Sequence, residues 1–233
     1  MAGYLIEYRF HGYAKSYARD LIYEISRKFN VKGATRNRAV PHVTLFGPFS
    51  ARSERQIVSQ VVSACKNYEI VPFRVEGFGC FDKPTGKVIY LDIKPSNGLQ
   101  DLRRDIAKSL VSLAHTTEFD TSYNFSFHAT LAFKDINKKF EQIWSYIREN
   151  KKAPQIDQHL LRVTIIKNQK IMCEYDLMQK RLLTRGQALS AYQWRRTIEL
   201  LKSKIDDYES DSEEKPTIVE KTVGRLKWYF RKL

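Results

Sequence analysis

Two short segments of this chain repeat the pattern His-x-Thr-Leu, and each lies in an apolar stretch. The first is His42–Leu45 within Pro41–Phe49, and the second is His128–Leu131 within Phe127–Phe133. Short runs rich in apolar β-formers and bounded by Pro and Gly are typical of strands. Because successive side chains of a strand point to opposite faces, the His and the Thr of each copy share one face. We therefore predict two strands that each present an imidazole beside a hydroxyl.

The doubled pattern points to acid–base chemistry at phosphorus. A single histidine of this kind is more often structural, but two in the same frame favour a catalytic pair, His42 and His128. One imidazole can remove a proton from the attacking oxygen while the other delivers a proton to the leaving oxygen. The hydroxyls of Thr44 and Thr130 can hydrogen-bond the phosphate oxygens as charge develops. With these groups supplied by side chains, no metal site and no other cofactor is expected.

The elements predicted around the motifs follow one order twice, with a strand, a helix, a motif strand, a helix and a strand, and the second copy has one extra strand. We expect two lobes, at about residues 1–82 and 83–183, related by a pseudo-twofold axis that brings the two His/Thr faces together across a groove. The predicted strands outside the motifs are 3–10, 71–81, 87–94, 155–167 and 170–177, and the predicted helices are 13–29, 53–68, 97–113 and 138–150.

Charge favours a polyanionic partner. The chain carries 40 Lys and Arg against 26 Asp and Glu, a formal net charge of +14. Residues 186–233 hold only +2, so +12 lies on the part with both motifs. A basic excess of this size is expected of a protein that binds nucleic acid, and less often of one that binds an anionic membrane. A lysine-rich surface in contact with solvent explains the composition equally well, but the distribution of charge favours the nucleic acid.

The remaining composition predicts a folded cytoplasmic protein. The hydrophobic fraction is 42%, and no apolar run approaches the roughly 18 residues that span a bilayer. Glu7 interrupts the segment in which a signal peptide needs its apolar core. The cysteines, Cys65, Cys80 and Cys173, are odd in number and widely spaced, which favours reduced thiols.

Four residues near the motifs are candidates for substrate binding. Arg36 and Arg38 precede the first motif strand and Lys134 follows the second, so each could bind a flanking phosphate. Phe46 is two positions beyond Thr44 and would share its face, where it could stack on a base. For each of them an ordinary surface or rim position is an equal alternative.

The segment 184–233 differs from the rest and is predicted to be a helical extension. One stripe of an amphipathic helix is formed by Ala191, Trp194, Ile198, Leu201, Ile205 and Tyr208. Residues 206–214 hold six carboxylates and are predicted to be a solvated linker. Residues 219–233 form a second, basic amphipathic stripe. Such helices usually pack on their own protein or on a second copy, which we expect here, and less often lie on a membrane.

At the two motifs the sequence resembles the two-histidine (2H) phosphoesterase superfamily, and within it the 2′-5′ RNA ligase / RNA 2′,3′-cyclic phosphodiesterase family. The likeness rests on His42–Leu45 and His128–Leu131, with support from Pro41–Phe49 and from the segment ending at Glu174–Leu177, and it covers about residues 1–180. It implies a bilobal α+β fold with two antiparallel sheets facing across a cleft and helices on the outer faces. It also implies that His42 donates and His128 accepts the proton, with Thr44 and Thr130 holding the phosphate.

The main hypothesis is therefore a metal-independent phosphodiesterase that acts on a 2′,3′-cyclic phosphate or a 2′-5′ linkage of RNA ends or small nucleotides. The alternative is a non-catalytic RNA-binding module that uses the same basic groove, and a third, weaker hypothesis places the extension on a membrane or a partner. The sequence leaves open which nucleotide is used, whether a 2′- or a 3′-phosphate is produced, whether ligation occurs in the cell, and the oligomeric state.

Overall fold

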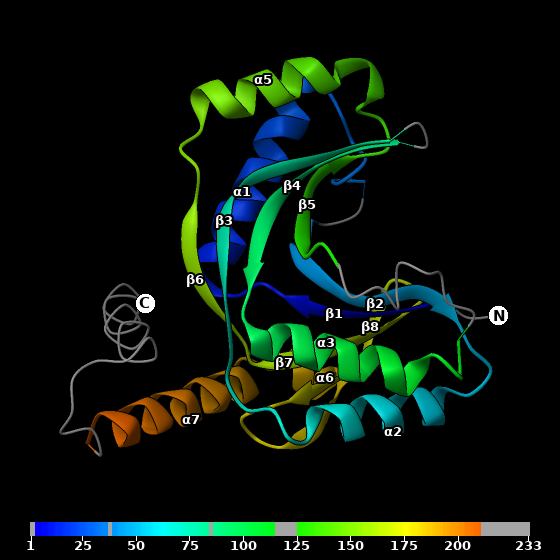
Figure 1. Ribbon diagram of the computed structural model, residues 1–233, viewed down its shortest axis with the longest axis vertical. Helices are drawn as coiled ribbons and strands as arrows, with labels where there is room; N and C mark the ends of the chain where they lie inside the picture. Colours follow the sequence, from blue (N-terminus) through cyan, green and yellow to red (C-terminus); the bar gives the residue numbers. More distant parts are fainter. Residues whose placement is uncertain (1–2, 37–38, 84–85, 115–124, 211–233) are drawn as a thin grey trace.

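The computed structural model describes residues 3–36, 39–83, 86–114 and 125–210 (Figure 1). The strands are β1 (Gly3–Arg9), β2 (His42–Ser50), β3 (Val71–Lys83), β4 (Gly86–Pro95), β5 (His128–Phe133), β6 (Gln155–Leu160), β7 (Arg162–Lys167), β8 (Lys170–Asp176) and β9 (Arg181–Thr184). The helices are α1 (Gly12–Phe29), α2 (Glu54–Cys65), α3 (Asn97–Leu110), the 3-10 turn η1 (Asn137–Lys139), α5 (Phe140–Asn150), α6 (Arg185–Ala188) and α7 (Ala191–Ser210).

The strands form two antiparallel sheets, so the predicted α+β class is confirmed. The first sheet has the order β2-β1-β7-β8-β9 and the second has the order β5-β4-β3-β6. In Figure 1 the first sheet crosses the lower half of the view, and the second rises above it. Each motif strand, β2 or β5, is the edge strand of its sheet, and its sheet neighbour is the strand that precedes it across a helix.

The two sheets do not coincide with contiguous halves of the chain. The division expected near residue 82 falls within the β3–β4 hairpin of the second sheet, and β7, β8 and β9 return to complete the first sheet. The segment 155–167, predicted as one strand, is two strands in different sheets, separated at the fully buried Leu161. Hydrophobic alternation fixes the faces of a strand but not its partner, because pairing is set by residues far apart in sequence.

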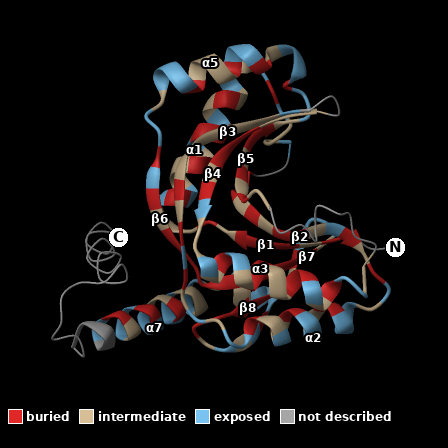
Figure 2. Ribbon diagram, in the orientation of Figure 1, coloured by how far each residue is buried: buried red, intermediate tan, exposed pale blue. Residues whose placement is uncertain are grey.

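Helices α1 and α3 each connect strands of one sheet but also pack on a strand of the other sheet, which holds the two sheets together. Helix α1 connects two strands of the first sheet, yet it contacts β5 of the second. Helix α3 connects two strands of the second sheet, yet it contacts β2 of the first and packs along α2. Each motif strand is therefore supported from behind by the helix that belongs to the other motif. Figure 2 shows the buried residues along these strands and on the inner sides of the helices.

The last described helix packs on the body, as predicted. Leu201 and Ile205 of α7 form a buried cluster with Leu161 and Met178. The helix continues to Ser210 and thus includes the first residues of the predicted linker 206–214. The predicted basic stripe, 219–233, lies outside the described residues. Among the helices of the described part, none combines the length and the apolar character needed to cross a membrane.

Candidate active site

The two motif strands present their His and Thr residues on one face, as predicted. In β2, His42 and Thr44 are partly exposed while Val43 and Leu45 are buried. In β5 the same alternation holds, with partly exposed positions at His128 and Thr130. The buried faces belong to the main hydrophobic core, so each His-Thr pair is mounted on a rigid support.

Both strands carry a bulge at the leucine that ends the motif, and the two bulges match. Along β1 and β2, Thr44 pairs with Glu7 but Phe46 pairs with Ile6, which leaves Leu45 as an extra residue. Along β4 and β5, Thr130 pairs with Tyr90 but Ala132 pairs with Ile89, which leaves one extra residue in β5. A bulge of this kind changes the face on which the following side chains lie.

The first bulge overturns one sequence prediction. Phe46 has no exposed surface and packs edge-on against Phe49, with ring centroids 5.1 Å apart. The bulge at Leu45 breaks the alternation, so Phe46 lies in the core rather than beside Thr44. It is a core residue and cannot stack on a base.

Both motif histidines are oriented by the same local contact. Nδ1 of His42 lies 2.8 Å from the carbonyl oxygen of Val40, and Nδ1 of His128 lies 2.9 Å from that of Ser126. A carbonyl oxygen can only accept, so Nδ1 carries the hydrogen in each ring. The reactive nitrogen of each neutral imidazole is therefore Nε2.

The surroundings of His42 are ionic. Its Nε2 lies 3.7 Å from Oε2 of Glu7, whose side chain is only 4% exposed. The other oxygen of Glu7 accepts a hydrogen bond of 2.7 Å from Nε of Arg9. When His42 is protonated, this carboxylate forms an ion pair with it, and the attraction is strengthened by burial.

The surroundings of His128 are aromatic. The ring of Phe81 meets it edge-on at a centroid distance of 5.0 Å, and the ring of Tyr90 lies 5.2 Å away. Burial is the main cause that lowers the pKa of His128 below its ordinary value of 6.5, and the charge of His42 lowers it further. The carbonyl of Ser126 and the carboxylate of Asp92 only partly offset this effect. This imidazole is neutral near pH 7 and suits a proton acceptor.

The two motif strands approach each other although they belong to different sheets. Residues of β2 and β5 come within 8 Å of one another, measured between Cα atoms. His42 and Thr130 line one open groove of about 720 Å³ together with Glu7 and Arg9. His128 and Thr44 are not among the residues that line this groove, but His42 is close enough to His128 to influence its pKa.

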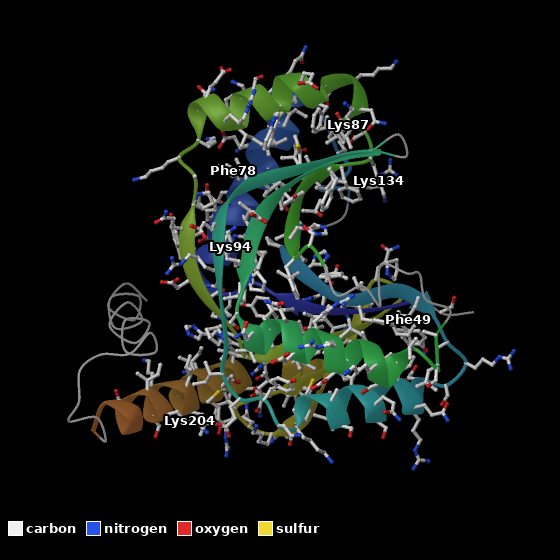
Figure 3. The ribbon with its side chains drawn as sticks, viewed as in Figure 1. Phe49, Phe78, Lys87, Lys94, Lys134 and Lys204 are labelled. Carbon is white, nitrogen blue, oxygen red and sulfur yellow. The ribbon has the colours of Figure 1, made fainter. Side chains whose placement is uncertain are left out.

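Two of the predicted phosphate-binding residues lie on the same groove. Arg36 and Lys134 are exposed and line it, and Figure 3 shows Lys134 beyond the end of β5. The carboxylate of Asp135 accepts hydrogen bonds from the backbone N–H groups of Lys32 and Gly33, which joins the Arg36 loop to the end of β5. Arg38 lies outside the described residues, and its role stays a prediction.

The approach of this loop to β5 requires a glycine. A Cβ atom at Gly33 would lie 2.0 Å from the carbonyl oxygen of Phe133, closer than any atom can approach without a shift of the backbone. The loop therefore fits against β5 only because position 33 has no side chain.

The described residues offer no group of three or more His, Cys, Asp or Glu side chains arranged to hold a metal ion. The expectation that the reaction needs no metal stays a prediction. His11 and His159 lie apart from the motif strands, and burial lowers the pKa of each to about 4.

Comparison with known proteins identifies the family. The model of the 2′-5′ RNA ligase superfamily matches residues 18–170, which include both motif strands. The chain belongs to this superfamily. The match contains all four motif residues, so the recognition made from the two His-x-Thr-Leu segments is confirmed.

A curated relative and a solved structure are among the proteins that are similar to this chain. A protein of Geobacillus sp. (strain WCH70), named as a candidate phosphoesterase, is 28% identical over 110 residues, which make up 46% of this chain and 60% of the relative. The chain thus spans about three fifths of that relative. The structure of Usb1 from Kluyveromyces marxianus superposes with a TM-score of 0.46 and 7% identity, covering 78% of this chain and 97% of the other.

Sequence reasoning missed the residues that make the two histidines different. The sequence patterns place Phe81 and Tyr90 in predicted strands and Glu7 near the N-terminus, but they do not bring any of the three to a motif histidine. Glu7 and Tyr90 occupy matching places, each opposite the threonine of a motif. The only sequence signal for Glu7 is a carboxylate within an apolar strand, which usually needs a buried partner.

Proposed function

We propose that this protein is a phosphodiesterase that hydrolyses a 2′,3′-cyclic phosphate, or a 2′-5′ linkage, at RNA ends or in small nucleotides without a metal. The observation that carries the proposal is the pair of motif strands from opposite sheets, whose histidines are anchored alike through Nδ1 and keep Nε2 for chemistry. Membership of the superfamily and the name of the Geobacillus relative support an enzyme of the phosphoesterase class.

In the proposed mechanism His128 is the base and His42 is the acid. Nε2 of His128 takes a proton from water as the water oxygen attacks phosphorus. The bond from phosphorus to one ribose oxygen breaks, and Nε2 of His42 gives its proton to that oxygen. The ring opens to a phosphate monoester, and proton exchange with solvent returns both histidines to their starting states.

The two threonines and the basic residues hold the substrate. Hydroxyl groups of Thr44 and Thr130 donate to the non-bridging oxygens, where negative charge increases in the transition state. Arg36 and Lys134 bind phosphates next to the reacting one. Glu7 stays ion-paired with the protonated His42 until the proton has been transferred.

The alternative is an RNA-binding module with no turnover, which the net charge of +14 fits equally well. One experiment separates the two. An RNA oligonucleotide with a 2′,3′-cyclic end is incubated with the protein in the presence of a chelator, and its terminal phosphate is identified. The proposal predicts a monoester at one ribose position, and the alternative predicts that the cyclic end persists although the RNA is bound. The cytoplasmic location stays a prediction.

A further inference from the structure

A second cavity lies on the same sheet as His42, on the side where the C-terminal extension docks. It has a volume of about 360 Å³. Its walls come from β1, the start of α1, β7, β8 and the connection between α6 and α7, and the side chains used below are Arg9, His11, Lys15, Arg162, Leu189 and Trp194. No residue of this cavity except Arg9 is part of the groove that contains His42.

Arg9 joins the two spaces. It lines both the catalytic groove and the second cavity. Its Nε atom donates to Glu7, and no described residue accepts a hydrogen bond from its Nη atoms. The planar end of a guanidinium matches the geometry of a phosphate group. A phosphate at the junction of the two spaces would therefore meet a guanidinium that Glu7 already holds in place.

The wall formed by the extension is rigid. Arg162, which is 5% exposed, donates to Asp176 at 2.9 Å, to the carbonyl oxygen of Gln193 at 2.8 Å and to Oγ1 of Thr197 at 2.6 Å. Its guanidinium lies over the indole of Trp194, 4.9 Å from the ring centroid. This buried network fixes the start of α7, and with it the indole that lines the cavity.

The charge and polarity of the cavity suit a nucleotide. Arg9 and Lys15 line it together with the ion pair of Arg162 and Glu174, whose Nη1 and Oε2 atoms lie 3.4 Å apart, and burial raises the pKa of the Glu174 carboxyl above its ordinary value. His11 stays neutral near pH 7, because burial lowers its pKa to about 4. Its Nε2 lies 3.0 Å from the carbonyl oxygen of His159 and therefore donates to it, which leaves Nδ1 as an acceptor.

We propose that this cavity binds the nucleotide next to the reacting one, with its base against the part of Trp194 that Arg162 and His11 leave uncovered and the linking phosphate on Arg9. The inference rests on the proposed function and narrows it: the preferred substrate is an RNA end of two or more nucleotides. Aromatic side chains bind bases of single-stranded nucleic acid through stacking, and the cationic lining favours the backbone. The C-terminal extension would thus form part of the substrate site.

The test compares a nucleoside 2′,3′-cyclic phosphate with a trinucleotide that ends in the same cyclic phosphate. The wild-type protein should show a higher kcat/KM for the trinucleotide, by about tenfold or more, as one stacked base and one phosphate contact provide. Leu189→Glu places a negative charge at the rim of the cavity, at a position that is 62% exposed, so the fold tolerates it. This variant should lose most of the preference for the trinucleotide.

Three further variants control the result. Leu182→Glu adds the same charge at an exposed position of β9 that lines neither space, and it should keep the preference. Trp194→Phe keeps an aromatic ring and should retain part of the preference, whereas Trp194→Ala should lose it. Thermal unfolding of each variant identifies any that is misfolded. If the Trp194 variants are misfolded, the comparison of Leu189→Glu with Leu182→Glu is the test.

Equal kcat/KM values for the two substrates in the wild-type protein would overturn the inference and leave the proposed function intact, as would a preference unchanged by Leu189→Glu. If neither substrate is hydrolysed, the proposed function fails, and the inference is then tested by measuring how tightly the protein binds a trinucleotide. A fluorescently labelled trinucleotide with a 3′-phosphate should then bind the wild-type protein more tightly than the Leu189→Glu variant. Equal affinities would reject the second site.

Discussion

Nε2 of His42 lies 3.7 Å from Oε2 of Glu7, a residue of β1 whose carboxylate is almost completely buried. The matching place in the second sheet holds Tyr90, whose ring lies beside His128. Two histidines in near-equivalent positions therefore have different partners, one ionic and one aromatic. This difference is the reason why the proposed mechanism takes His42 as the acid and His128 as the base.

The first prediction concerns Glu7. Glu7→Gln keeps the shape of the side chain and a hydrogen-bond acceptor for Arg9, but it removes the charge next to His42. The attraction between two opposite charges about 4 Å apart is worth about 1–4 kcal/mol, depending on how far water screens the pair, so kcat should fall about ten- to a hundredfold with a smaller change in KM. Glu69→Gln, a change at an ion-paired residue on the surface, is the matched control. Steady-state kinetics with an unchanged kcat for Glu7→Gln would remove Glu7 from the mechanism.

The second prediction concerns pH. A base must be neutral to act, and the pKa of His128 is lowered by burial, so kcat/KM should rise with pH through a midpoint below 6.5. Phe81→Ala opens the aromatic surroundings and should move this midpoint up toward 6.5. Phe78→Ala removes a ring from the same strand without contact to His128 and serves as control. A midpoint that is the same in all three proteins would contradict the assignment of His128 as the base.

The third prediction concerns the threonines. Thr44→Val and Thr130→Val replace each hydroxyl by a methyl group of similar size at a partly exposed position, so stability should change little. Loss of one donor to developing negative charge typically lowers kcat about 10²- to 10³-fold. Rates measured on the 2′,3′-cyclic substrate check this, with unfolding in urea as the control for stability. Near wild-type rates in both variants would show that the hydroxyls do not contact the phosphate.

The fourth prediction concerns stability in acid. His159 is 3% exposed and has its pKa lowered from 6.5 to about 4, chiefly by burial and then by His11. Between these values the unfolded chain binds the proton and the folded chain does not, so stability falls as pH decreases from 6.5 toward 4. The loss from His159 alone should reach about 2 kcal/mol by pH 5.

Urea unfolding at pH 7.5 and at pH 5 measures this loss. In His159→Gln the difference between the two pH values should shrink by the share of His159, while His11 still contributes in the same direction. An identical pH dependence in the variant and the wild-type protein would show that His159 is not the group responsible.

Local patterns were sufficient to predict the motif strands, their exposed faces and the supporting helices. The alternation from His42 to Leu45 is a property of neighbouring residues, and it was correct for that reason. Phe46 was assigned to the wrong face because the bulge depends on how β2 pairs with β1. Glu7 was missed for the same reason, since its position opposite Thr44 follows from a pairing that no local pattern encodes.

The way the chain divides between the two sheets also depends on pairings that local patterns do not encode. The order of elements suggested contiguous halves, and the matching bulges of β2 and β5 support an internal repeat. The strands are nevertheless shared, because the segment 155–167 crosses from the second sheet to the first at Leu161. Such a crossing leaves no mark in hydrophobic periodicity, which is alike for strands of either sheet.

The most direct test of the account is the rate at which the protein opens a 2′,3′-cyclic phosphate at an RNA end in the presence of a chelator, compared with His42→Ala and His128→Ala. The wild-type protein should form a phosphate monoester as fast with the chelator as without it. Each variant should stay folded, because both side chains are partly exposed, and should lose activity by about 10²- to 10⁴-fold. A rate close to that of the wild-type protein in either variant, or no turnover by the wild-type protein, would contradict the two-histidine mechanism.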